Sequence, residues 1–207
     1  LVGNWGWAIV AMTVNRAELN RLAADSRVVR VWEDEAVSHN LGDSVGLVSG
    51  ASPGGDLTGI EGADGHGTTI AIIDSGVDSS HPFLAGRVVR EACFSTASGT
   101  GRVSFCPTEA TQKGPGSGRA CPEVSGCSHG THVAGIAAGD GSTITSGAPK
   151  RGMAPKAKIF SIQVFHRVND AEACGGTAPC IRSSFSDMLA AYDHLLGEMG
   201  NLAEPLV

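Results

Sequence analysis

The segment CSHGTHVAGIAAG, residues 127–139, decides how the rest of the chain is organised. It contains His129 near its start and continues into a run of glycine, alanine and other small residues. Each glycine inside a solvated helix costs about 1 kcal/mol relative to alanine. The run therefore predicts a buried helix whose missing side chains let neighbouring backbone come close. Such a helix would hold His129 rigidly at the edge of the core, which makes His129 a candidate base.

Strand patterns lie on both sides of this segment. Upstream, TTIAIID (residues 68–74) is an apolar run that ends in Asp74, as expected of a buried parallel strand. Downstream, KIFSIQVF (residues 158–165) predicts a second strand. The alternation of strands and helices indicates an α/β chain with a parallel sheet.

The C-terminal part continues this alternation. Ser186 is the expected N-cap of a helix whose apolar residues recur with a 3.6-residue period from Met188 to Met199. Gly200 is a natural end for that helix. An apolar strand is expected to start at residues 204–207, so both ends of the chain are expected to be the edges of a fragment, since there is also no initiator Met.

The first 40 residues have a different pattern. Residues 7–13 and 28–32 predict two strands, and Asn15 followed by Glu18 is typical of a capping box that opens a helix between them. A unit of about 30 residues is too small to be stable alone, so it is expected to pack on something larger. The glycine-rich stretch 37–66 predicts a linker.

The composition excludes several classes of partner. The chain has 15 Lys and Arg against 21 Asp and Glu, a formal net charge of -6, and no basic cluster. This argues against binding to nucleic acid or to an anionic membrane surface. No apolar run approaches the roughly 20 residues that a membrane-spanning helix needs.

The six cysteines form three pairs of near neighbours along the chain. Sequence alone does not fix their pairing, but the short loops between neighbours favour the local set of disulfides. These pairs are Cys93 with Cys106, Cys121 with Cys127, and Cys174 with Cys180. A metal or redox site at the last pair is the alternative, and it lacks C-x-x-C spacing. Disulfides indicate an oxidising, extracellular compartment.

Asp74 and His129 are the candidate catalytic residues. Ligands of open parallel sheets bind outside the carboxyl ends of the strands, where Asp74 is expected. Alone, Asp74 could cap the next turn and His129 could be structural. Together they match an Asp–His pair, in which the carboxylate orients the imidazole and stabilises its charged form.

The other histidines provide a weaker hypothesis. His129 and His132 could be two metal ligands, but H-E-x-x-H spacing is absent, and Thr131 and Val133 favour a packed His132. No metal site is therefore predicted. The remaining isolated histidines are expected to be structural or exposed: His66, His81, His166 and His194.

Three motifs carry a resemblance to a known family. IAIIDSGVD (residues 70–78), followed by His81 and Pro82, resembles the aspartate motif of subtilisin-like serine proteases. HGTHVAG (residues 129–135) resembles their histidine motif, and GMAPKA (residues 152–157) the segment after it. The motifs occur in the family's order. The resemblance covers about residues 40–207. It implies a three-layer α/β fold with a doubly wound, mostly parallel sheet that is incomplete at the C-terminus. It also implies catalysis by an Asp-His-Ser triad that requires no cofactor.

The resemblance also implies a division of the chain. Residues 1–40 are similar to the C-terminal part of an inhibitory propeptide, a small α+β remnant, and residues 41–207 to the N-terminal part of the peptidase domain. Autoprocessing would fall around residues 35–45. The implied partners are polypeptide substrates and the protein's own propeptide as intramolecular inhibitor, in a secreted enzyme. The oligomeric state and the substrate specificity are not predicted.

The chain departs from the family in one respect. The serine motif Gly-Thr-Ser-x-Ala, the substrate-binding Ser-Leu-Gly strand and the oxyanion Asn do not occur in the 207 residues. The full-length protein is therefore predicted to be a serine-type endopeptidase, with Asp74 and His129 as two of three triad members, and this chain alone to be inactive. The alternatives are a non-catalytic binding or inhibitor module and a metal-dependent hydrolase that uses His129 and His132.

Two further expectations follow from the resemblance. The family tends to present an edge strand to the substrate where this chain has Ile181, Arg182, Ser183 and Ser184. The cysteine-bearing excursion from about residue 90 to 127 is similar to an insertion in disulfide-rich bacterial secreted members. Structural calcium is frequent in such enzymes, but the sequence indicates no ligands for it.

Overall fold

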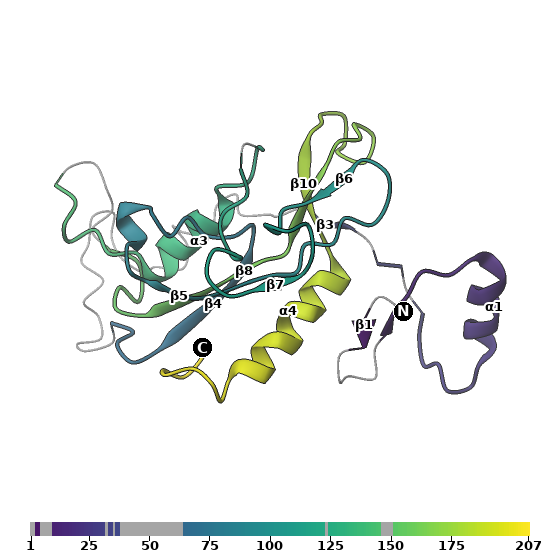
Figure 1. Ribbon diagram of the computed structural model, residues 1–207, viewed down its shortest axis with the longest axis horizontal. Coiled ribbons are helices and arrows are strands. Elements are labelled where there is room, and N and C mark those ends of the chain that lie inside the picture. The colour runs from purple at the N-terminus through teal and green to yellow at the C-terminus, as the bar shows by residue number, and fades with distance from the viewer. Residues whose placement is uncertain are drawn as a thin grey trace, which may run out of the picture.

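The computed structural model describes residues 3–4, 10–31, 33–34, 36–37, 64–122, 124–145 and 151–207. A mostly parallel sheet lies at the centre of its larger part (Figure 1). The strand order is β4-β8-β5-β7, and the first three strands are parallel while β7 is antiparallel. These strands are β4 (Thr69–Asp74), β8 (Lys158–Gln163), β5 (Val88–Cys93) and β7 (Gln112–Lys113).

Helices cover both faces of this sheet. α3 (His129–Ala138) packs on the face that includes Ile159, and α4 (Phe185–Glu198) packs on the face that includes Phe160. Neighbouring residues of a strand point to opposite faces, so β8 separates the two helices. This is the three-layer α/β arrangement that the sequence predicts, and the fold class is confirmed.

A second, antiparallel sheet lies beside the first, in the order β3-β10-β9-β6. Its strands are β3 (Ala36–Val37), β10 (Cys180–Ser184), β9 (Phe165–Val168) and β6 (Arg102–Ser104). The prediction of a single strand over residues 158–165 is wrong at its end. β8 ends at Gln163, whose Oε1 accepts from the Phe165 amide at 2.7 Å, and from Phe165 the chain continues as β9 in the second sheet.

The C-terminal segment adds to the edge of the main sheet. The Thr69 amide donates to the Pro205 carbonyl and the Val207 amide to the Thr69 carbonyl, each at 2.8 Å. The expected strand is thus present only as an isolated parallel bridge between Leu206 and Thr69 of β4. The predicted cap is wrong, because α4 begins at Phe185 and its N-cap is Ser184. The amide of Ser186 donates to Asp34 instead.

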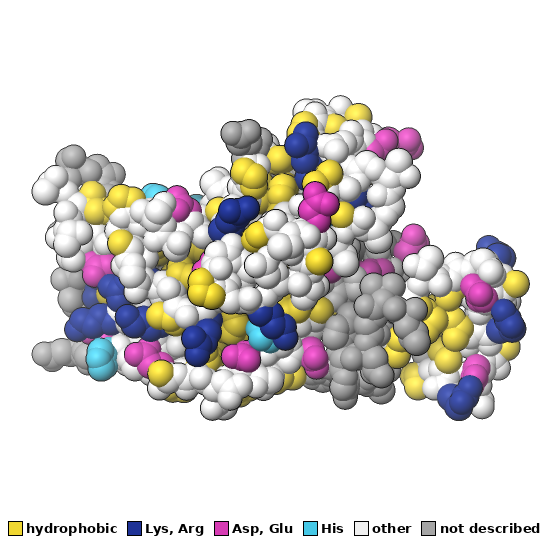
Figure 2. Space-filling model, in the orientation of Figure 1, with side chains coloured by type: hydrophobic (Ala, Val, Ile, Leu, Met, Phe, Trp, Pro, Cys, Tyr) yellow, Lys and Arg dark blue, Asp and Glu magenta, His cyan; other side chains and the backbone are white. Residues whose placement is uncertain are grey.

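The N-terminal part is small. α1 (Arg16–Ala24) begins with the predicted capping box, in which Asn15 and Glu18 exchange side-chain bonds to backbone amides at 2.8 and 3.0 Å. β1 (Gly3–Asn4) pairs with β2 (Val10–Ala11). No residue of α1 is buried, and Figure 2 shows hydrophobic side chains at its surface beside charged ones.

The strand expected over residues 28–32 is wrong for the part that the structure describes. Residues 28–31 are not a strand, and Val29 is fully exposed. A strand needs a neighbour to complete its hydrogen bonds, and none lies beside this segment in the described residues. Most of the expected linker, and the boundary between residues 40 and 41, lie outside the described residues, so the division into two domains stays a prediction.

Candidate active site

Asp74 is the last residue of β4, at the carboxyl edge of the parallel strands. Its carbonyl accepts a hydrogen bond from the Val164 amide at 3.0 Å, which ties the end of β4 to the end of β8. Its carboxylate oxygen Oδ1 accepts from the amide of Ser75 at 2.6 Å. The side chain is 13% exposed, so the carboxylate is held at the rim of the sheet with little contact to water.

His129 is the first residue of α3 and faces Asp74. Its Nδ1 lies 2.8 Å from Oδ1 and 2.9 Å from Oδ2 of Asp74, and its side chain is 12% exposed. A carboxylate at this distance favours the tautomer with the proton on Nδ1, which leaves the lone pair on Nε2. An imidazole held in this way has the orientation that a general base requires. The structure therefore brings together two residues that are 55 positions apart.

Glycines allow the two elements to approach each other. A Cβ atom at Gly130 would lie 2.3 Å from the Gly76 carbonyl oxygen. Gly76 has φ +80°, and a Cβ atom there would lie 2.0 Å from the carbonyl oxygen of Arg119. A larger residue at position 130 would push α3 away from the end of β4, and one at position 76 would push away the segment at Arg119. The small residues of the HGTHVAG motif therefore set the distance between His129 and Asp74.

Ser75 is a part of the site that the sequence does not single out. It is fully buried, and its Oγ accepts a hydrogen bond from the Gly130 amide at 2.9 Å. Its carbonyl accepts from Nε2 of Gln163 at 2.6 Å. A serine after an aspartate is common in turns, and these partners lie 55 and 88 positions away, so only the fold identifies its contacts.

The other histidines do not join this pair. His132 is exposed, so the expectation that it is packed is wrong; on α3 it points away from the small residues that face the core. Among the described residues, no three His, Cys, Asp or Glu side chains converge as a metal site requires. Hence no calcium or zinc ligand set can be named from them. Elsewhere, His66 is exposed, His81 accepts from the Phe83 amide, and His194 packs on Phe94 and Phe160.

His166 has a distinct environment on β9. It is fully buried, between Ser104 of β6 and Arg182 of β10. Burial, together with the positive charges of Arg102 and Arg182, lowers the pKa of His166 to about 4. The expectation of a structural histidine fits this neutral, enclosed ring.

The predicted substrate-binding residues form β10. This strand is not at an edge in the structure, because β9 lies on one side and β3 on the other. Val37 pairs with Ser183 and Ala36 with Ser184, in antiparallel orientation. Asp34 precedes this pair in the chain, and its Oδ1 accepts from the amide of Ser186, just after β10, at 2.9 Å. Ala36 and Val37 thus occupy one side of the strand that the sequence predicts to bind substrate.

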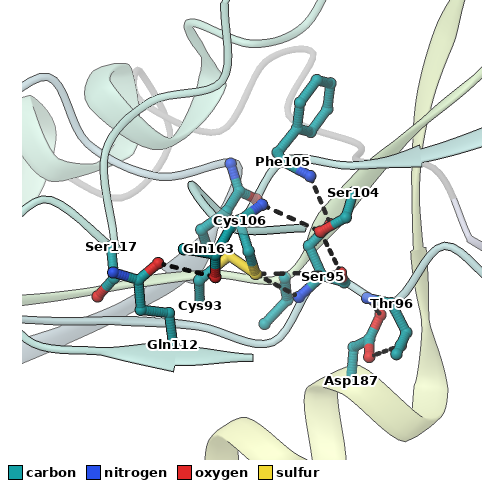
Figure 3. The surroundings of a disulfide bond; sticks show 12 residues. Cys93, Ser95, Thr96, Ser104, Phe105, Cys106, Gln112, Ser117, Gln163 and Asp187 are labelled. Carbon is teal, nitrogen blue, oxygen red and sulfur yellow. Dashed lines mark hydrogen bonds between the residues drawn. A yellow bond between two sulfur atoms is a disulfide. The ribbon is translucent and has the colours of Figure 1, made fainter. Parts of the chain in front are cut away.

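Three disulfides join the neighbouring cysteines that the sequence analysis favours: Cys93–Cys106, Cys121–Cys127 and Cys174–Cys180. The first links β5 to the loop after β6, where Ser95 and Cys106 are in contact (Figure 3). Thr96, next to Ser95, donates through its amide and its hydroxyl to Asp187 of α4. Desolvation by burial raises the pKa of Asp187 to about 7, which the nearby negative charge of Asp34 also favours.

Comparison with known families identifies the chain. The model of the subtilase family, peptidase S8, matches residues 65–180, which is more than half of the sequence. The chain belongs to the subtilase family. The match contains both Asp74 and His129, and it agrees with the resemblance of the sequence motifs.

This subtilase is similar to several curated proteins. It is 31% identical over 156 residues to subtilisin E of Bacillus subtilis (strain 168), with 74% of this chain and 33% of the relative covered. Thermitase of Thermoactinomyces vulgaris is 38% identical over 102 residues, with 49% and 28% covered. Subtilisin-like protease 3 of Pseudogymnoascus destructans is 32% identical over 146 residues, with 70% and 26% covered. The chain thus spans a third or less of the length of these relatives.

Among solved structures, the chain is similar to Sphericase. The two are 34% identical, with a TM-score of 0.35, and the alignment covers 49% of this chain and 26% of that one. Among the described residues, no helix is both long and apolar enough to cross a membrane.

Proposed function

We propose that this subtilase acts in peptide-bond hydrolysis as part of a secreted serine endopeptidase, with Asp74 and His129 as two members of its triad. The contact of His129 Nδ1 with both oxygens of Asp74, at 2.8 and 2.9 Å, carries this proposal. In the reaction, His129 takes the proton of a serine hydroxyl as that oxygen attacks the peptide carbonyl, and returns it to the leaving amine. Asp74 orients the ring and stabilises the imidazolium while it exists.

The nucleophile is the missing member. The family's serine motif does not occur in the 207 residues, so we propose that this chain alone does not hydrolyse peptides. Histidine and aspartate without the nucleophile cannot form the acyl intermediate, and loss of the nucleophile removes most of the catalysis by a triad. The complete reaction requires a serine supplied by further sequence of the same protein.

The substrate is proposed to bind as an extended strand along β10, at Ile181, Arg182, Ser183 and Ser184. Addition of a strand to a sheet supplies main-chain hydrogen bonds that do not depend on sequence. The antiparallel pairing of Ala36 and Val37 with this strand supports the proposal, because a substrate would pair with β10 in the same extended form.

Residues 1–40 are proposed to be the end of an inhibitory propeptide, with autoprocessing around residues 35–45. Ala36 and Val37 lie along β10, where they would exclude a substrate from the same side of the strand. N-terminal sequencing of the mature secreted protein is expected to find a start between residues 35 and 45. A mature protein that begins before Trp5 would contradict this assignment.

A fluorophosphonate probe tests the catalytic proposal. The full-length gene product is expected to be labelled on a serine and to hydrolyse casein, and the 207-residue chain to do neither. Asp74→Asn in the full-length protein is expected to lower hydrolysis by roughly 10⁴-fold, because the imidazole loses its orienting carboxylate. Asp140→Asn is the matched control, since Asp140 pairs with Arg87 at 2.8 Å and does not contact His129.

Two outcomes would replace the proposal. A full-length protein that binds peptides but is neither labelled nor active would be a binding or inhibitor module. Activity that a chelator abolishes and the probe leaves intact would indicate a metal-dependent hydrolase. No contact in the described residues favours either one.

A further inference from the structure

We propose that the disulfide between Cys121 and Cys127, acting through Ser75, positions His129 against Asp74. This inference rests on the proposed function, since it concerns the alignment of the proposed catalytic pair. Neither the disulfide nor Ser75 would touch a reacting atom, so these are positioning residues.

The N-terminus of α3 is capped by another element. The first turn of a helix leaves backbone N–H groups without partners inside the helix, and the side chain of the N-cap residue usually accepts from one of them. Ser128, the N-cap of α3, makes no such bond. Instead, Oγ of Ser75 accepts from the amide of Gly130, the residue after His129, at 2.9 Å. Ser75 therefore sets where α3 starts.

Ser75 also binds the carboxylate partner. Its amide donates to Oδ1 of Asp74 at 2.6 Å, and the same oxygen lies 2.8 Å from Nδ1 of His129. One residue thus contacts the carboxylate through its amide and the histidine-bearing helix through its hydroxyl. A displacement of Ser75 changes the distance between the ring and the carboxylate.

The disulfide loop encloses Ser75. The Ser75 hydroxyl donates to the carbonyl of Cys127, two residues before His129, at 3.2 Å. The Cys121 amide donates to the Ser75 carbonyl at 3.1 Å. The disulfide joins these two cysteines, so both backbone groups belong to one closed loop. Ser75 is fully buried, which means that water cannot take over these contacts without a change of the loop.

A second disulfide offers a matched control. Cys174 and Cys180 are also separated by six positions. The loop-closure contribution of a disulfide depends on the number of residues it encloses, so this contribution is expected to be similar for the two bonds. Cys121 and Cys127 are buried in the core, whereas Cys174 and Cys180 are only partly buried, so removal of the first bond is expected to lower the melting temperature more. The Cys174–Cys180 loop precedes β10, and none of its described hydrogen bonds involves Ser75, Asp74 or His129. In variants that remain folded, a change in the contact between His129 and Asp74 is therefore expected only on removal of the Cys121–Cys127 bond.

Proton NMR of the 207-residue chain provides the test. An imidazole Nδ1–H that donates to a carboxylate gives a far-downfield signal, which Asp74→Asn should remove and thereby assign to His129. The signal is expected to be lost or shifted upfield in the double variant Cys121→Ser/Cys127→Ser and in Ser75→Ala. It is expected to persist in Cys174→Ser/Cys180→Ser. It should also persist in Ser161→Ala, which removes another fully buried hydroxyl bonded to a backbone carbonyl.

The outcomes separate this inference from the proposed function. An unchanged signal in Ser75→Ala, or an equal loss in the Cys174→Ser/Cys180→Ser control, would overturn it. If the Cys121→Ser/Cys127→Ser variant does not fold, Ser75→Ala decides the question, since it retains all three disulfides. The measurement requires no nucleophile and no hydrolysis. A full-length protein that fails to react with the fluorophosphonate would therefore contradict the proposed function and leave this result standing.

Discussion

The two helices that cover the central sheet are built in opposite ways. α3 consists largely of small residues, and Gly130, Ala134, Gly135 and Ala138 are buried in it. α4 has large apolar residues, of which Leu195 is buried while others lie at the surface. The exposed ones are Phe185, Tyr192 and Leu196.

The difference shows how each helix is held. At its first turn α3 meets the loop after β4 through backbone, because a Cβ atom at Gly130 would collide with the backbone of Gly76. At the other end, a Cβ atom at its C-cap Gly139 would collide with the ring of Phe83 in the short 3₁₀ helix η1 (Pro82–Leu84). α4 touches the sheet through side chains, which can adjust by rotation. Close backbone contact leaves α3 one position relative to β4, and a residue that must stay within 3 Å of Asp74 needs such a position.

The largest effect is expected when this backbone contact is broken. Gly130→Ala places a Cβ atom 2.3 Å from a carbonyl oxygen, and no side chain can rotate to relieve the clash. Overpacking costs typically 1–3 kcal/mol, so a loss of about 3 kcal/mol in the free energy of unfolding is expected. Urea denaturation measures it. A loss below about 1 kcal/mol would show that α3 can move relative to β4, which would contradict the stated difference between α3 and α4.

Substitutions of two adjacent leucines test whether α4 is held on the sheet by its side chains. Leu195→Ala is expected to cost roughly 2–3 kcal/mol, because it leaves a cavity against the sheet. Leu196→Ala is the matched control: its side chain is 51% exposed, so a change within about 0.5 kcal/mol is expected. Equal losses in thermal and urea denaturation would mean that α4 is covered on both sides.

The first turn of α4 is expected to make stability depend on pH. Burial raises the pKa of Asp187 to about 7 from 3.8. Between these values the folded protein holds a proton that the unfolded chain has released, so ionisation of Asp187 lowers stability as the pH rises through this window. Asp187→Asn removes this loss and can keep both hydrogen bonds with Thr96.

The free energy of unfolding of Asp187→Asn should match the wild type near pH 4 and exceed it above pH 7. A gain on the order of 2 kcal/mol is expected. Urea titrations across this range measure the difference. A difference that does not change with pH would refute the raised pKa.

The smallest effect is expected at a glycine of α4. A Cβ atom at Gly197 meets nothing within 4 Å. Gly197→Ala should therefore stabilise the protein by about 0.5–1 kcal/mol, because alanine loses less backbone entropy in a helix. Urea denaturation of both variants is therefore expected to show that a glycine-to-alanine substitution raises the free energy of unfolding in α4 and lowers it in α3.

Local patterns predicted the elements whose causes are local. The capping box of α1 needs only Asn15 and Glu18, and the apolar run before Asp74 is enough to indicate β4. The secondary-structure predictions failed where the conformation depends on a partner far away in the sequence. Residues 28–31 have strand-forming side chains but no neighbouring strand among the described residues. Ser186 suits an N-cap, yet its amide is used by Asp34, which is 152 positions away.

The sequence by itself determined the family, the α/β class and the pairing of Asp74 with His129 as a hypothesis, because motif order and hydrophobic periodicity are written along the chain. Only the tertiary structure decided that Ser75 links the two residues and that Cys121 and Cys127 enclose it. The physical reason is that a serine hydroxyl takes whichever donors and acceptors the fold brings to it. Its partners at Cys127 and Gly130 are separated from it by more than 50 residues, and no local pattern encodes them.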